Sequence, residues 1–83
     1  MQSDMKFTNY FLHTRERADR CDIKMEWIEQ VFLSPDHEVV QADGRVRRWG
    51  YIPEAGKYLR IIILEDKQTI HNAFFDRSFN LED

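Results

Sequence analysis

The sequence predicts an α+β fold in which two N-terminal helices pack on one face of a roughly four-stranded antiparallel sheet. Apolar residues recur with helical spacing before Pro35, and strand-like runs follow it, separated by short turns. Helices followed by a run of strands are typical of α+β domains, in which the helices cover one sheet face. The 83 residues suffice for a single domain with one modest core.

The first helix is expected from Thr8 or Tyr10 to about Arg20. Pairs of opposite charge spaced four residues apart support one solvated face of this helix: Arg15/Asp19 and Glu16/Arg20. Asp22 is then expected to cap the second helix. Ser34-Pro35 ends that helix, because proline disfavours helical geometry in the residue before it. Its apolar positions recur with helical period: Ile23, Trp27, Ile28, Val31 and Phe32.

Four strands and their turns fill the rest of the chain. Residues 1–7 and 77–83 are expected to be loosely ordered ends, although Phe79 and Leu81 are candidates to dock. Asp43-Gly44 and Asp66-Lys67 are the expected turns, and Pro53–Gly56 is the expected loop. The expected strands are Glu38–Ala42, Arg45–Ile52, Tyr58–Leu64 and Thr69–Phe75.

The turn at Asp66-Lys67 sets an expected register for the sheet. Ile63 then faces Ile70, Ile61 faces Asn72 and Leu59 faces Phe74; in the preceding hairpin Trp49 faces Ile61 and Tyr51 faces Leu59. Opposed residues share a face, so these residues are expected on the core side. A slip of one residue would reverse every assignment. The other face is expected to carry Arg48, Tyr58, Arg60, Ile62, His71 and Phe75.

The distribution of charge indicates an anion-binding surface. The formal net charge is −3, yet five cations and the single anion Glu54 lie between Arg45 and Arg60. Arginine binds phosphate with two parallel hydrogen bonds and keeps its charge. Aromatic side chains nearby can stack on bases. These residue types therefore predict an RNA-binding surface.

These residue types favour the cleavage of RNA without a metal ion, as in a metal-independent ribonuclease. His71 would move the proton of a ribose 2′-hydroxyl, while Arg48 and Arg60 would stabilise the charge that develops on the phosphate. Further contacts with RNA are expected from Tyr58, Arg47 and Phe75. The alternative is that Arg and His on this face are merely solvated, because an open sheet face must be polar.

Two other clusters are open to a functional and a structural interpretation. His13, Arg17 and Arg20 share one helix face, where they either extend the RNA-binding surface or simply pack and pair; pairing is the favoured interpretation. Asp76-Arg77 either orients His71 or fixes the tail, and a structural ion pair is favoured.

Several function classes are not expected. The residues His13, Cys21, His37 and His71 lack zinc-ligand spacing, and no Gly-rich loop precedes a helix, so neither a metal nor another cofactor is predicted. No apolar run approaches the roughly 20 residues that span a membrane. A single cysteine and no signal-like segment favour a cytoplasmic location.

Short motifs along most of the chain support a family resemblance: His13-x-x-x-Arg17-x-x-Arg20-x-x-Ile23, Val31-x-Leu33-Ser34-Pro35, Tyr58-Leu59-Arg60-Ile61-Ile62 and Thr69-Ile70-His71-Asn72-Ala73-Phe74-Phe75-Asp76-Arg77. Together they resemble a small uncharacterised bacterial domain family related to the RelE/BrnT-like group of toxin-antitoxin ribonucleases. The resemblance implies two helices on an antiparallel sheet, RNA or the ribosome as target, and an antitoxin protein as partner. It also implies roles for His13, Arg17, Arg60 and His71. The acidic net charge departs from the basic character of many relatives.

A non-catalytic protein-interaction domain is the rival hypothesis. In such a domain an exposed strand edge or the basic face would receive an acidic segment of another chain. An exposed edge strand would also favour a homodimer.

Overall fold

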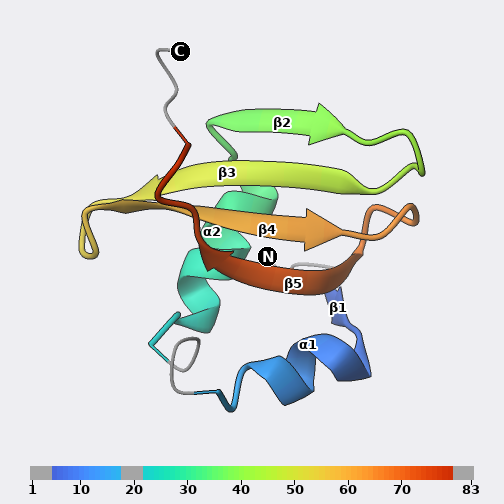
Figure 1. The fold of residues 1–83 in the computed structure, drawn as a ribbon, viewed down its shortest axis with the longest axis horizontal. Helices are drawn as coiled ribbons and strands as arrows, with labels where there is room; N and C mark the ends of the chain where they lie inside the picture. The colour runs from blue at the N-terminus through green and yellow to red at the C-terminus, as the bar shows by residue number, and fades with distance from the viewer. Residues whose placement is uncertain (1–4, 18–21, 80–83) are drawn as a thin grey trace.

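The computed structural model describes residues 5–17 and 22–79 and confirms an α+β fold with two helices. A five-stranded sheet has the strand order β1-β5-β4-β3-β2; in Figure 1 helix α2 passes behind this sheet and α1 lies below β5. The sheet is mixed, because β1 runs parallel to β5 while the other strands form an antiparallel meander. The elements are β1 (Lys6–Phe7), α1 (Asn9–Thr14), α2 (Met25–Leu33), β2 (His37–Val40), β3 (Val46–Ile52), β4 (Lys57–Ile63) and β5 (Thr69–Phe75).

Strand β1 was not expected from the sequence. Lys6 pairs with Thr69 and Phe7 with Ile70, so part of the expected loose lead instead forms an edge of the sheet. A two-residue strand carries too short an alternation to be read from a sequence. Beyond the last strand, Phe79 packs on the sheet as one of the two docking candidates, while Leu81 lies outside the described residues.

Helix α1 begins where the sequence predicts and ends earlier. The Thr8 side chain accepts a hydrogen bond from the Phe11 backbone N–H, which caps the helix. The helix ends at Thr14, and turns replace the expected continuation through residue 17. Arg20 and Cys21 lie outside the described residues.

Helix α2 begins later than predicted, because Lys24 and not Asp22 is the N-cap residue. Ile23 is nevertheless buried, so the chain enters the core two residues before the first helical residue, Met25. The predicted apolar stripe Trp27, Ile28, Val31 and Phe32 is buried, and the helix ends at Ser34-Pro35 as expected.

The hydrophobic core lies between the helices and one face of the sheet, called here the helix face. Helix α2 contacts β3 and β4, and α1 contacts β5. The largest fully buried side chains come from every layer of this arrangement: Phe11, Ile23, Ile28, Val31, Val46, Ile52, Leu59, Ile61, Ile63 and Ile70. Among residues 5–17 and 22–79, no helix covers the opposite face of the sheet, which is called the open face.

The predicted register between β3 and β4 is wrong by one residue. Trp49 pairs with Arg60 instead of Ile61, and Tyr51 pairs with Tyr58 instead of Leu59. The cause lies in the connecting loop. Gly56 adopts a left-handed conformation (φ +64°) and its N–H bonds to the Ile52 carbonyl, so the loop closes one residue earlier than expected. Trp49 and Tyr51 therefore lie on the open face.

The predicted register between β4 and β5 is wrong beyond Ile63, because a β-bulge interrupts the pairing there. Ile63 pairs with Ile70 as expected, but Ile62 pairs with Asn72, which leaves His71 as an extra residue. Beyond the bulge Ile61 faces Ala73 instead of Asn72, and Leu59 faces Phe75 instead of Phe74. Phe75 therefore lies on the helix face, where it packs against the core.

Candidate functional site

Arg48 lies on the helix face and not on the open face where the sequence placed it. Its guanidinium donates hydrogen bonds to the Glu38 carboxylate and to the Phe32 backbone carbonyl. The guanidinium carbon also lies 5.5 Å from the centre of the Phe32 ring. These contacts join the end of α2 to strands β2 and β3, which is a structural role.

Arg60 lies on the open face, as predicted, and is held by neighbours. Nη1 lies 3.4 Å from Oδ2 of Asp76. The guanidinium also contacts the rings of Trp49 and Phe74, at 5.8 and 4.8 Å from the ring centres. Asp76 therefore neutralises the charge that a phosphate would need.

Asp76 fixes the start of the C-terminal segment. Its carboxylate accepts hydrogen bonds from Nε1 of Trp49 and from the Ser78 hydroxyl, besides pairing with Arg60. Burial opposes ionisation of the carboxyl, but the hydrogen bonds from Trp49, Ser78 and Arg60 outweigh it and lower its pKa to about 2. The favoured interpretation, in which Asp76 forms a structural ion pair and fixes the tail, agrees with this geometry.

His71 is separated from both arginines by the bulge. Its Nδ1 lies 3.2 Å from the Thr8 hydroxyl, and its ring stacks on Tyr10 with 4.8 Å between ring centres. It therefore faces the α1 side of the molecule. The three residues predicted to form one catalytic centre lie in three different environments.

The residues predicted to contact RNA are similarly divided. Tyr58 and Arg47 lie on the open face, through their pairs with Tyr51 and Ile62. Phe75 lies on the helix face, with its ring 6.2 Å from Trp27 and the Lys57 ammonium 5.2 Å from it. His13 and Arg17 are exposed at the end of α1 and just beyond it.

An aromatic row on the open face is the feature that sequence analysis missed. The row consists of five rings that contact one another across β2, β3, β4 and the C-terminal segment. Phe79 is its centre: its ring stacks on Trp49 at 4.8 Å and meets Tyr58 at 5.0 Å and His37 at 5.6 Å. Tyr58 in turn meets Tyr51 at 5.2 Å, and His37 meets Trp49 at 5.4 Å.

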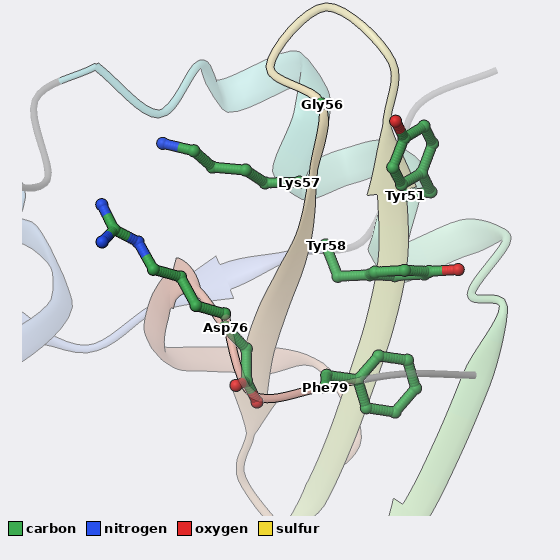
Figure 2. A pocket seen from close by; sticks show the side chains of 7 residues that line it. Tyr51, Gly56, Lys57, Tyr58, Asp76 and Phe79 are labelled. Atoms are coloured by element: carbon green, nitrogen blue, oxygen red, sulfur yellow. The ribbon is translucent and has the colours of Figure 1, made fainter. Parts of the chain in front are cut away.

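A hollow of about 300 Å³ adjoins one end of the aromatic row. Figure 2 shows Tyr51, Tyr58 and Phe79 projecting to one side of β4, while Lys57 extends to the other. Tyr51, Tyr58 and Phe79 thus form an aromatic wall of the hollow. Its lining residues are Tyr51, Gly56, Lys57, Tyr58, Asp76, Arg77 and Phe79.

The aromatic row could have been found only with the correct register. The sequence shows Trp49, Tyr51 and Tyr58, but the expected register buried the first two under the helices. With Ile52 paired to Lys57, all three share the open face. Phe79 was only a docking candidate, because nothing in the sequence fixes where a segment after the last strand crosses the sheet.

Among residues 5–17 and 22–79, no three His, Cys, Asp or Glu side chains gather as a metal site would require. None of the helices in this part of the chain has the length and apolar character needed to cross a membrane. Comparisons with protein-family models, curated proteins and solved structures find no match. The relationship to the RelE/BrnT-like group stays a prediction.

Proposed function

We propose that this chain binds single-stranded RNA on the open face of its sheet. The aromatic row is the observation that carries the proposal. Rings on a sheet surface are a common platform for unpaired bases, because every base has a π-face that can stack on them. Tyr51 lies at one end of the row with 43% of its surface exposed, so a base can reach its ring without any rearrangement.

Cations beside the row supply contacts for the phosphates. Arg77 lines the hollow next to Tyr51 and Tyr58, whereas the Lys57 side chain extends to the other side of β4, toward Phe75. Arg47 lies on the same face as the row, two residues before Trp49 on β3. Because the whole chain is acidic, these local cations give a weak electrostatic contribution that falls as salt is added. Stacking is therefore the larger part of the affinity.

The proposal covers binding and does not include cleavage. A metal-independent ribonuclease needs a proton carrier and cations around one phosphate. Arg48 is bonded on the helix face, Arg60 is paired with Asp76, and His71 stacks on Tyr10. The proposed relationship to toxin-antitoxin ribonucleases, with the ribosome as target and an antitoxin as partner, requires an activity assay of its own.

Replacing Tyr51 with alanine tests the proposal. Removing one stacking ring typically costs about 1–3 kcal/mol per base, so binding of a fluorescent oligouridylate should weaken by about 5- to 150-fold in an anisotropy titration. Tyr10→Ala is the matched control, because Tyr10 is 51% exposed but belongs to α1 and stacks on His71, away from the aromatic row. Equal affinities of wild type and Tyr51→Ala, or a similar loss in Tyr10→Ala, would contradict the proposed surface.

A protein-interaction domain is the second candidate, and the exposure of strand β2 favours it. Every residue of β2 is exposed, and β2 is the last strand on its side of the sheet. Such an edge can receive a strand of another chain. Failure of RNA binding together with capture of a second strand at β2 would favour this function over the first.

A further inference from the structure

The outer edge of β2 offers unpaired backbone groups. Within residues 5–17 and 22–79, the sheet order ends at β2 and no further strand pairs with it (Figure 1). The Gln41 N–H bonds to the Arg45 carbonyl, which directs the backbone groups of alternate residues 37, 39 and 41 toward β3. The N–H and C=O groups of Glu38 and Val40 therefore face outward.

The usual protections of an edge strand are weak in β2. Natural edge strands are often blunted by lysine, proline, a bulge or an inward-pointing charge. Residues His37–Val40 contain no lysine or proline, and their pairing with β3 shows no register shift. The one charged residue, Glu38, is already bonded to Arg48. Val39 and Val40 remain 40% and 61% exposed.

A second copy of β2 fits this edge in an antiparallel register centred on Val39. When Val39 lies opposite Val39 of the second copy, Glu38 faces Val40 in both directions, and all the outward groups of both strands form hydrogen bonds. Shifting the register so that Glu38 faces Glu38 would place like charges opposite each other and leave outward groups of Val40 without an equivalent partner. The strand is therefore self-complementary about Val39.

Side chains in this register are compatible on both faces. On the open face the two Val39 side chains meet, and His37 lies opposite Gln41 of the second copy. On the helix face Glu38, whose charge is balanced by Arg48, lies opposite an exposed Val40. Apolar contacts thus occupy the centre of the pair, with no like charges directly opposed.

We infer that two copies of this chain form a symmetric dimer by antiparallel pairing of their β2 strands. The two-fold axis passes through the Val39 pair, perpendicular to the sheet, so both open faces lie on the same side of one continuous sheet. The aromatic row of each copy reaches β2 through His37. The dimer therefore joins two aromatic rows on one surface; that they bind one RNA strand together rests on the proposed function, whereas the dimer itself does not.

Disulfide trapping without RNA tests the strand register. In a Cys21→Ser background, Val39→Cys should oxidise to a covalent dimer, because residues opposed in a non-hydrogen-bonded pair have Cα atoms about 4.5 Å apart, within the range of a disulfide. Val40→Cys in the same background is the matched control and should cross-link far less, since its opposite residue is Glu38. Preferential cross-linking of Val40→Cys, or of neither variant, would overturn the proposed pairing.

Light scattering with size-exclusion chromatography tests the dimer in solution. From micromolar to near-millimolar concentration, the wild-type mass should rise toward that of two chains. Val39→Lys should raise the dimer dissociation constant by at least about tenfold, because the two introduced lysines then face each other across the two-fold axis. Leu12→Lys, an exposed position on α1, should leave it unchanged. A wild type that stays monomeric throughout would overturn the inference, and the trapping experiment decides it if Val39→Lys fails to fold. Loss of RNA binding in an intact dimer would contradict only the proposed function.

Discussion

Arg60 and Asp76 connect the open face of the sheet to the segment that follows it. Asp76 also accepts hydrogen bonds from Trp49 and Ser78, so a single carboxylate holds β3, β4 and the start of the C-terminal segment. This arrangement positions Phe79 over Trp49 at the centre of the aromatic row. The arginine that the sequence suggested for catalysis thus builds the surface that we propose for binding.

The lowered pKa of Asp76 makes a prediction about stability. A carboxyl whose folded-state pKa lies below its usual 3.8, here at about 2, stabilises the fold above pH 3.8 and loses this contribution as the pH falls through about 2. Allowing for solvent screening, Asp76→Asn should lower the free energy of unfolding by about 1–2 kcal/mol at pH 7. Urea denaturation should show this difference shrinking toward zero near pH 2.

Glu54→Gln controls for the loss of one negative charge, since Glu54 lies exposed in the loop between β3 and β4. This variant should unfold like the wild type at pH 7. A difference between Asp76→Asn and wild type that is the same at pH 7 and pH 2 would contradict the role given to the ionised carboxylate.

Strand β3 and helix α2 meet so closely that one position excludes a side chain. A Cβ atom added at Gly50 would lie 2.7 Å from Cγ2 of Val31. Gly50 pairs with Leu59 on the helix face, so the strand reaches the helix through its backbone. The glycine therefore fixes how near α2 lies to the sheet.

Gly50→Ala should destabilise the protein by about 1–3 kcal/mol, the usual cost of overpacking a core. Adding Val31→Ala should recover part of this loss beyond the sum of the single effects, as measured by a double-mutant cycle with urea denaturation. Gly56→Ala is a useful comparison, because nothing lies within 4 Å of an added Cβ there and only its positive φ is strained. Strict additivity of Gly50→Ala and Val31→Ala would contradict direct contact between the two sites.

The elements of this fold differ in how far the sequence predicts them. The buried stripe of α2 and the alternation of β4 follow from residue spacing, and both are confirmed. Pairing between strands is harder to predict, because it depends on single backbone conformations. A positive φ at Gly56 shifts the pairing of β3 with β4 by one residue. The extra residue His71 moves the side chains at the end of β5 to the opposite face from the one predicted.

The whole molecule has one covered face and one open face, and this asymmetry determines the candidate site. Sequence analysis predicted aromatic and cationic residues on the surface, and Tyr58 and Arg60 lie on the predicted side of the sheet. It could not predict the aromatic row, because Trp49 and Tyr51 depend on the register and Phe79 depends on the path of the C-terminal segment. The resulting surface is better suited to stacking than to proton transfer.

Backbone NMR during an RNA titration would show, residue by residue, whether RNA binds on the open face of the sheet. Oligouridylate should be added at low salt to ¹⁵N-labelled protein. The change in amide chemical shift of each residue is then compared between residues of the open face and residues of the helix face. If RNA binds at the aromatic row, the amide shifts change most at Tyr51, Tyr58 and Phe79, and in the loop that contains Gly56. An absence of shifts, or shifts concentrated on α1, α2 and His71, would contradict binding at this surface.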